Sequence, residues 1–370
     1  MSDDLKKDPF KDYLRETEPG KKDRGYAWYT AIGLQAVDGL KTSKYLQDTA
    51  VKNIEGQISI DDAERLINSY YEERPDNSEQ ERTKEADQVS LRIARILSEK
   101  SFSFTPNEYI SIHRKLFTGI YSHAGKIRDY NITKKEWVLD GKTVIYGSAS
   151  ELRATLEYDF SEERKFKYKN LSMDEIIQHL ALFVSRLWQI HVFGEGNTRT
   201  TAVFFIKYLR TLGFDVTNDI FAENAWYFRN AMVRANYNDL QHGIHETTEY
   251  LELFLRNLLL NESNELKNRY LHIRWKPEEQ DFEAVKQDIE TAKQDIEIPD
   301  SVSNKTKQHI RHLFGEYGFE AFFGRTEVME VLHLSASPAS ELIRKMLAME
   351  LIYPVKGKGK GKYLFKKADA

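Results

Sequence analysis

Apolar side chains recur every three or four residues through most of this chain, the spacing that places them on one face of a helix. The segments with the clearest pattern are residues 40–56, 59–73, 172–191, 198–213 and 223–236. Gly56 and Gly213 stand where the first and fourth of these patterns stop, as expected of residues that end helices. The sequence therefore predicts a mainly α-helical protein.

One segment departs from the helical pattern. Residues 134–150, KKEWVLDGKTVIYGSAS, contain two short β-prone runs around Asp140 and Gly141. Asp-Gly is a pair favoured in tight hairpin turns. We therefore expect a small β-hairpin in this part of the chain.

Shifts in composition divide the chain into four parts. Residues 1–85 contain several amphipathic helices, and residues 86–262 carry the densest apolar patterns. Residues 263–300 are highly charged with a thin apolar stripe, which suits a connecting helix. Residues 301–370 have a core pattern of their own, with three predicted helices followed by a β-hairpin. That order is similar to a winged helix domain.

Charge and composition narrow the class of protein. The chain of 370 residues has 54 Lys and Arg against 58 Asp and Glu, so its net charge of -4 says little about partners. It has no cysteine, which excludes disulfides and thiol-bound metals. We find no signal peptide and no apolar run of the ~18–20 residues that a membrane helix needs. A cytoplasmic protein without membrane contact is expected, and a homodimer is left open.

The stretch HVFGEGNTRT, residues 191–200, lies between two predicted helices. A helix N-terminus leaves backbone N–H groups unpaired and favours anions, and Gly194 and Gly196 let a ligand approach those groups closely. Arg199 adds a permanent positive charge that suits phosphate oxygens. Glu195 opposes bare phosphate but suits Mg²⁺ held against phosphates. His191, across the loop, has a pKa suited to taking a proton from a hydroxyl.

A simpler interpretation stands beside this one. A histidine at a helix end followed by a glycine-containing turn is more often a cap than a catalyst. The combination of a histidine, an acid, Gly-Asn and an arginine at one helix N-terminus favours chemistry.

The stretch resembles the signature of the Fic family, His-x-Phe-x-(Asp/Glu)-Gly-Asn-(Gly/Lys)-Arg. The resemblance implies that His191 is the general base and that Phe193 anchors the loop. It implies that Glu195 binds Mg²⁺, that Gly196 and Asn197 shape the anion hole, and that Arg199 binds nucleotide phosphates. Thr198 replaces the usual glycine, and its hydroxyl could cap the helix or donate to a phosphate. Val192 replaces a proline, which only loosens the turn.

The resemblance extends over residues 86–262. The predicted hairpin is similar to the family's flap, whose edge pairs with an extended target segment. Val144, Ile145 and Tyr146 are the candidate docking edge. The segment ENAWYFRNAMVRAN is similar to the one beside the adenosine, where Tyr227 and Asn230 would contact the nucleoside. Core packing is the alternative for Tyr227.

AVKNIEG, residues 50–56, resembles the family's inhibitory helix. The resemblance implies that Glu55 pairs with Arg199 and removes the charge that should hold the γ-phosphate. An exposed glutamate before a helix-ending glycine is the alternative.

The C-terminal part raises a separate question. Its basic patch is formed by Lys356, Lys358, Lys360, Lys362, Lys366 and Lys367. The patch suits a DNA backbone, whereas a winged helix used for protein contacts is equally consistent with it. The third predicted helix offers Ser340, Arg344 and Lys345 as polar readers, which is little for sequence-specific binding.

The sequence as a whole predicts a Fic-type helical enzyme with a C-terminal winged helix. Its expected reaction is transfer of AMP from ATP, with Mg²⁺, to a Ser, Thr or Tyr hydroxyl of a target protein or of itself. Two alternatives stand. A Fic enzyme could transfer another nucleotide or phosphoryl group, or remove AMP. In a different class, the protein would be a DNA-binding regulator whose Fic core senses nucleotide.

Overall fold

A computed structural model describes residues 9–15, 18–72, 78–275, 299, 304–319, 321–332, 334, 336–355 and 361–366. They divide into two compact units, Met1–Trp275 and Lys276–Ala370, and each unit has its own hydrophobic core. The described residues are mainly helical, as the apolar pattern predicts.

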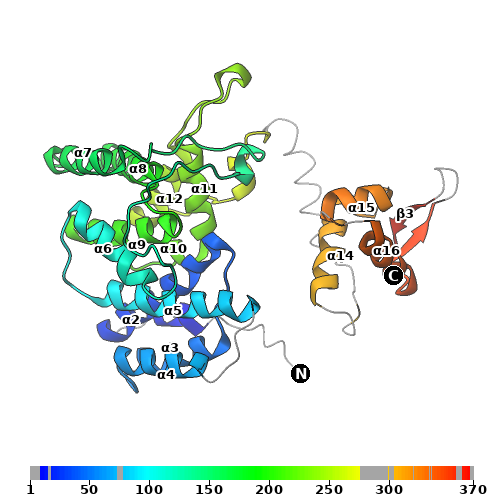
Figure 1. Cartoon of the computed structure of the whole chain (residues 1–370), viewed down its shortest axis with the longest axis horizontal. Coiled ribbons are helices and arrows are strands. Elements are labelled where there is room, and N and C mark those ends of the chain that lie inside the picture. Colours follow the sequence, from blue (N-terminus) through cyan, green and yellow to red (C-terminus); the bar gives the residue numbers. More distant parts are fainter. Residues whose placement is uncertain are drawn as a thin grey trace. The chain divides into compact units, whose positions relative to one another are not determined.

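The first unit begins with a group of helices that the chain builds before residue 100 (Figure 1). They are α1 (Pro9–Tyr13), α2 (Pro19–Gly33), the 3₁₀ helix η1 (Leu34–Asp38), α3 (Lys44–Ile54), α4 (Ile60–Glu72) and α5 (Ser78–Ser98). Helix α2 packs along α5, and α4 packs against both α3 and α5. The predicted helices at 40–56 and 59–73 are thus confirmed as α3 and α4. Gly56 has a φ of 74°, the left-handed conformation expected just after a helix.

The remaining elements of this unit surround the loop of interest. They are α6 (Pro106–Phe117), η2 (Trp137–Leu139), α7 (Leu152–Lys165), α8 (Met173–Ile190), α9 (Asn197–Thr211), α10 (Ile220–Glu223), α11 (Ala225–Arg234), η3 (Leu240–His242), α12 (Glu249–Leu260) and η4 (Asn268–Leu271). Ser172 and Glu175 form a capping box at the start of α8. Helix α9 is buried from Asn197 to Leu209 and packs against α5, α6 and α8, so it is the central helix of the unit.

The predicted β-hairpin is wrong. Residues 129–150 are described throughout and contain no strand. The segment instead turns through η2, and Asp140 and Gly141 then adopt left-handed φ values of 55° and 78°. Several of its backbone bonds are local, such as Gly141 N–H to Glu136 O at 3.0 Å, and Val138 O accepts one from Ile273 N at 2.9 Å. The burial of both Val138 and Leu139 accounts for the first of the two runs, because consecutive buried residues do not present the alternating faces of a strand.

The second unit contains α14 (Asn304–Tyr317), β1 (Phe323–Gly324), α15 (Arg325–Leu332), α16 (Ala336–Ala348), β2 (Ile352–Pro354) and β3 (Lys362–Phe365). The strands form an antiparallel sheet in the order β1-β3-β2. The three predicted helices and the two hairpin strands lie at the expected positions, and the short β1 was not predicted. The assignment to the winged helix class stays a prediction.

The basic patch of this unit is only partly described. Lys356, Lys358, Lys360 and Lys367 lie outside the described residues, as does most of the predicted linker at 263–300. Lys362 contacts Glu327, and Lys366 lies 3.8 Å from Glu350. On α16, Arg344 donates two hydrogen bonds to Glu341. Lys362, Lys366 and Arg344 therefore each have an acidic side chain close by.

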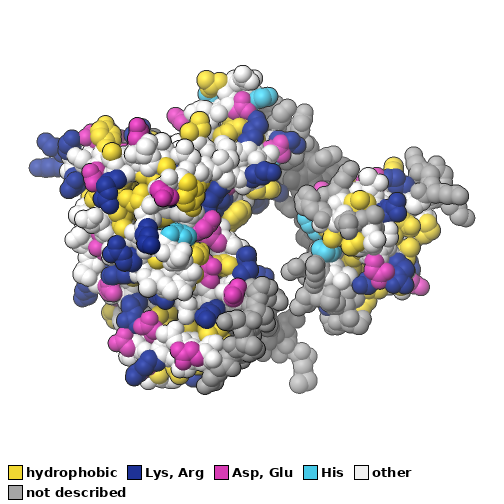
Figure 2. All heavy atoms as spheres, viewed as in Figure 1, with side chains coloured by type: hydrophobic (Ala, Val, Ile, Leu, Met, Phe, Trp, Pro, Cys, Tyr) yellow, Lys and Arg dark blue, Asp and Glu magenta, His cyan; other side chains and the backbone are white. Residues whose placement is uncertain are grey.

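The visible surface carries both signs of charge intermingled over the helices (Figure 2). That mixture fits the near balance of acidic and basic residues in the sequence. Among the described helices, we find none that combines the length and the apolar character needed to cross a bilayer.

Candidate functional site

The loop between α8 and α9 holds His191 in an unusual backbone conformation. His191 ends α8 with φ 50° and ψ 57°, in the left-handed region that few non-glycine residues adopt. Its amide donates to Trp188 O at 3.0 Å. The conformation turns the chain sharply out of the helix. Backbone strain of this kind is a feature of functional sites that the surrounding structure must hold in place.

The imidazole of His191 is buried and free of hydrogen bonds. It is 3% exposed, and neither Nδ1 nor Nε2 has a partner among the described residues. Its ring packs against the rings of Tyr146, with a centroid distance of 4.3 Å, and Trp188, at 5.3 Å. Burial, and then the positive charge of Lys134, lower the pKa of His191 well below its usual value. The side chain is therefore a neutral base whose nitrogen lone pair is not used by any described residue.

Asn197 and Gly196 hold the loop in shape, and their expected role in an anion hole stays a prediction. The Asn197 amide accepts a hydrogen bond from Phe193 N at 3.0 Å and donates one to Phe193 O at 2.7 Å. Gly196 caps α9 with a φ of 75°, and a Cβ there would lie 2.4 Å from the Phe117 ring. Only glycine fits both the conformation and the space. Phe193 is fully buried and thus anchors the loop.

Arg128 fastens the loop to the neighbouring segments, and sequence reasoning missed it. Its guanidinium donates to the carbonyl oxygens of His191 at 2.7 Å, Tyr130 at 2.5 Å and Gly147 at 2.6 Å. Its own amide donates to Val192 O at 3.0 Å. Arg128 is only 5% exposed. It ties the loop to the segment around Gly147, so it sets the backbone on both sides of His191.

His113 also holds the loop in shape, and sequence reasoning missed it. Its Nε2 lies 3.0 Å from Glu195 O, and its Nδ1 accepts a hydrogen bond from Gly125 N at 2.8 Å. The two contacts assign a neutral ring with its proton on Nε2. Burial lowers the pKa of His113 to about 4, which agrees with that assignment. Its ring stacks on Phe193 with centroids 3.7 Å apart. The apolar spacing of α6 places a histidine inside, but nothing in the sequence names its partner.

Arg199 is fully engaged by residues from the first helices. Its Nε lies 2.8 Å from Asp38 Oδ2, and its Nη2 donates to Glu85 Oε1 at 2.8 Å. Its Nη1 donates to Gln35 at 3.1 Å. The side chain is 1% exposed and lies over the Phe117 ring. The residue expected to hold phosphates therefore holds two carboxylates in this structure.

The expected pairing of Glu55 with Arg199 is wrong. Glu55 accepts a hydrogen bond from the Tyr13 hydroxyl at 2.7 Å and lies 2.8 Å from Lys21 Nζ. These two contacts, first from Lys21 and then from Tyr13, lower the pKa of Glu55. Because α3 ends at Ile54, whose carbonyl accepts from Arg24, the carboxylate is directed toward α1 and α2. Asp38 and Glu85, and not Glu55, form the ion pairs with Arg199.

Glu195 is the expected Mg²⁺ ligand. Its side chain is 56% exposed, and its Oε2 lies 3.0 Å from Lys134 Nζ. No group of three or more His, Asp or Glu side chains suited to a metal occurs among the described residues. Mg²⁺ is commonly bound by one or two carboxylates together with substrate phosphates. A single accessible carboxylate at the loop fits that pattern. Binding of Mg²⁺ would require Lys134 to move away from Glu195.

Thr198 has a partner that the sequence did not indicate. Its Oγ1 accepts a hydrogen bond from Trp188 Nε1 at 3.0 Å, and the residue is 7% exposed. The hydroxyl therefore joins α8 to α9 behind the loop. Its oxygen is already used, although the hydroxyl proton remains available for donation.

Replacing Thr198 with valine tests this contact. Valine has nearly the same shape but leaves the buried Trp188 N–H without an acceptor. We expect the free energy of unfolding to fall by about 1–3 kcal/mol, measured by urea denaturation. Thr198→Ser is the matched control, because it keeps the acceptor. Equal losses in both variants would show that the hydrogen bond is not the cause.

The candidate docking edge is only partly available. Val144 is 2% exposed and Tyr146 is 9% exposed, whereas Ile145 is 83% exposed. Ile145 O accepts from Gln189 Nε2 at 3.0 Å. The side chains of Val144 and Tyr146 point into the core, and the expected pairing of this edge with a target through its main chain stays a prediction. Ile145 remains a candidate contact for a target.

Tyr227 and Asn230 are enclosed in this structure. Tyr227 is 2% exposed and Asn230 is fully buried, with its Nδ2 donating to Asn268 at 2.7 Å. Asn230 Oδ1 has no hydrogen-bond partner among the described residues. The burial supports core packing for Tyr227. Neither side chain is open to a nucleoside here.

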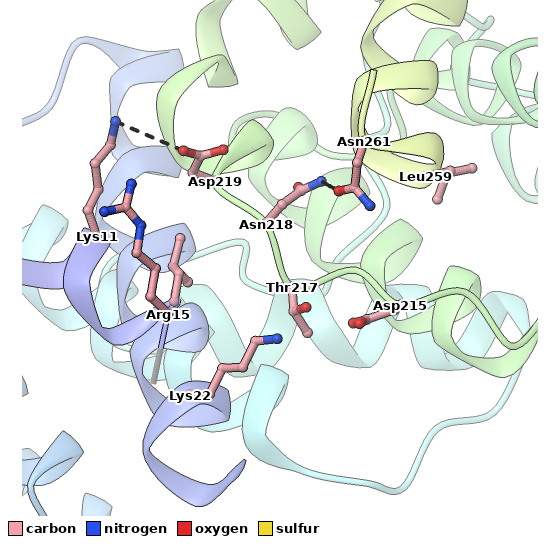
Figure 3. Close-up of a pocket in the computed structure, with 10 residues that line it drawn as sticks. Lys11, Arg15, Lys22, Asp215, Thr217, Asn218, Asp219, Leu259 and Asn261 are labelled. Atoms are coloured by element: carbon pink, nitrogen blue, oxygen red, sulfur yellow. Dashed lines mark hydrogen bonds and ion pairs between the residues drawn. The ribbon is translucent and has the colours of Figure 1, made fainter. Parts of the chain in front are cut away.

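A separate pocket of about 390 Å³ lies beside α1 and the segment before α10 (Figure 3). Lys11, Arg15 and Lys22 face Asp215 and Asp219 across it, and Lys11 Nζ lies 3.9 Å from Asp219. None of the predicted site residues lines this pocket. Its opposed charges do not select one kind of ligand.

Comparison with known proteins identifies the region around the loop. Residues 103–209 match the model of the Fic/DOC family. The protein adenylyltransferase VbhT of Bartonella schoenbuchensis is 30% identical over 108 residues, which cover 29% of this chain and 21% of VbhT. The match therefore spans about a fifth of the length of that relative.

Two solved structures are also similar. The N-terminal FIC domain of the effector protein Bep8 from Bartonella sp. 1-1C matches with a TM-score of 0.39 and 17% identity, covering 50% of this chain and 88% of that domain. A Fic family protein from Desulfovibrio desulfuricans G20 matches with a TM-score of 0.39 and 12% identity, covering 96% of this chain and 91% of that one.

The matched residues begin before α6 and run through the His191 loop into α9. They include His113, Arg128 and Asn197, which hold the loop in shape. This part of the chain is therefore similar to the Fic/DOC family.

Proposed function

We propose that this protein transfers AMP from ATP to a Ser, Thr or Tyr hydroxyl of a protein, with release of pyrophosphate. The observation that carries the proposal is the His191 imidazole in the loop that leads into α9: it is buried, its pKa lies well below the usual value, and it has no hydrogen-bond partner among the described residues. The similarity to a protein adenylyltransferase supports it.

The proposed reaction assigns a step to each of these groups. A hydroxyl oxygen attacks the α-phosphorus of ATP while its proton passes to a ring nitrogen of His191. The bond between the α-phosphorus and the bridging oxygen breaks, and pyrophosphate leaves. The first amides of α9 have no partner within their helix, so they are available to stabilise negative charge on the phosphoryl oxygens. Asn197 and Arg128 keep those amides and His191 in place.

Mg²⁺ would be held by Glu195 together with the phosphates, and it would offset their negative charge. Arg199 contacts the phosphates only if Asp38 or Glu85 releases it. Because Arg199 is 1% exposed between these carboxylates, binding of ATP competes with its internal ion pairs.

Mass spectrometry of the full chain tests the proposal. The protein is incubated with MgATP, alone and with a cell extract, and Ser, Thr and Tyr residues are searched for an added AMP. We expect the adduct with the parent and not with His191→Asn. Adducts from CTP, GTP or UTP in place of ATP would show another nucleotide donor, and an added phosphate would show phosphoryl transfer. Absence of every adduct would contradict the proposal.

The alternative of a DNA-binding regulator is not favoured by the described residues, since Arg344 and Lys362 are occupied by acidic neighbours. Binding of duplex DNA that weakens steeply with salt would support that alternative.

A further inference from the structure

Tyr146 is turned onto the candidate base and away from the surface. Its ring centroid lies 4.3 Å from that of His191, with an interplanar angle of 45°. Trp188 also packs against the imidazole, with its ring perpendicular to it, and lies next to Tyr146 with ring centroids 5.8 Å apart. Two neighbouring aromatic rings thus hold the plane of an imidazole that has no hydrogen-bond partner among the described residues.

The hydroxyl of Tyr146 is tethered to a buried acid. It donates to Glu136 Oε1 at 3.0 Å, and Glu136 is 1% exposed. Burial, and then the negative charge of Glu136, raise the pKa of Tyr146, so the hydroxyl keeps its proton for this bond.

Arg229 holds Glu136 in turn. Its Nη1 and Nη2 lie 2.7 and 3.0 Å from the two carboxylate oxygens, and its guanidinium lies over the Trp226 ring. A two-point contact of this kind fixes the carboxylate in orientation as well as in position. The contacts connect α11 to the segment around η2 and then to His191.

We propose that Tyr146, tethered by the Glu136–Arg229 ion pair, is a positioning residue that sets the orientation of the His191 imidazole for proton transfer. The proposal rests on the function proposed above, since it assigns His191 the role of base. A general base must meet its proton within a narrow range of distance and angle. His191 lacks the hydrogen-bonded partner that usually orients such a base, and ring packing supplies that role.

The arrangement also controls the charge near the base. Lys134, Arg128 and Arg229 are the positive groups that lower the pKa of His191. Glu136 offsets the charge of Arg229 at close range. The imidazolium that forms during transfer therefore does not face an unpaired Arg229.

Two variants of the full chain test the proposal. Tyr146→Phe keeps the ring and removes the tether. The double variant Glu136→Gln with Arg229→Gln removes the ion pair without leaving an unpaired buried charge. Tyr158→Phe, at a hydroxyl on a side chain that is 64% exposed, is the matched control.

The first measurement is NMR of the His191 ring, assigned by comparison with His191→Asn, and it requires no transfer activity. We expect both variants to shift and broaden the His191 signals and Tyr158→Phe to leave them unchanged. The second measurement is the rate of AMP transfer. We expect kcat to fall about 10- to 100-fold with KM for ATP unchanged. Unchanged His191 signals, or an unchanged kcat beside altered signals, would overturn the proposal. Absence of transfer by the parent would count against the proposed function alone, and the NMR result would still decide this inference.

Discussion

Replacing Arg128 with alanine is expected to lower the free energy of unfolding by about 3–5 kcal/mol. Its guanidinium donates to the carbonyls of His191, Tyr130 and Gly147, and the residue is 5% exposed. Hydrogen bonds from a charged donor stabilise more than neutral ones, and alanine would remove the partner of all three carbonyls, including the buried one of His191. Chemical denaturation of the full chain, followed by circular dichroism, measures the effect.

Two further variants separate the causes of that loss. Arg128→Lys keeps the charge, but a single ammonium cannot reproduce the planar set of donors that reaches three carbonyls. We therefore expect it to recover only a minor part of the stability. Arg153→Ala is the control, because Arg153 is exposed and lies 3.6 Å from Glu157 on the same helix. It should change the free energy of unfolding by no more than about 0.5 kcal/mol. A small effect of Arg128→Ala, similar to that of Arg153→Ala, would contradict the assigned role.

The helices of this protein could be predicted because their pattern is local. The periodicity of α8 and α9 and the glycines at their ends are properties of short segments. The loop between them could also be predicted, since Asn197 bonds to Phe193, four positions away, and the left-handed conformation of Gly196 is a property of the turn itself. Interactions between residues that are close in the sequence can be predicted from the residue types and their spacing.

The partners of Arg199 could not be predicted, for the opposite reason. Asp38 and Glu85 lie 161 and 114 positions away in the sequence, and neither belongs to a recognisable motif. Glu55 did belong to one, yet the closer cations Lys21 and Arg24 determine where the end of its helix lies. Which carboxylate reaches a buried arginine depends on how helices pack, and a charge pattern along the chain does not contain that information.

Residues 134–150, the segment predicted to form the flap, show a third reason why part of the structure could not be predicted. The Asp-Gly pair correctly indicates a tight turn, and both residues adopt left-handed conformations. The β-prone residues on either side were misleading, because the side chains of Val144 and Tyr146 are buried and Tyr146 packs against His191. β propensity describes how a side chain suits a half-buried surface, and an enclosed turn can use the same side chains.

We expect His191→Asn to reduce AMP transfer by about 10²- to 10⁴-fold, the usual contribution of a general base. Asparagine tolerates the left-handed conformation that His191 adopts at φ 50°, so the variant isolates the loss of the base. Its free energy of unfolding at pH 7.5 should lie within about 1 kcal/mol of the parent. Transfer is measured with labelled ATP, and His242→Asn, at an exposed histidine, is the control.

The same variant has a predicted pH signature. The pKa of His191 is lowered in the folded protein, so below pH ~6.5 the unfolded chain takes up a proton that the folded protein does not. Stability from this residue is therefore present above pH ~6.5 and lost as the pH falls below it. His191→Asn removes that contribution, so its stability should decline less than that of the parent between pH 7.5 and 5.5. The transfer rate of the parent should fall only at a pH below ~6.5, where the folded imidazole takes up a proton and can no longer act as the base. Parallel stability curves, or an acid limb of the rate centred at pH 6.5 or above, would contradict a buried, neutral base.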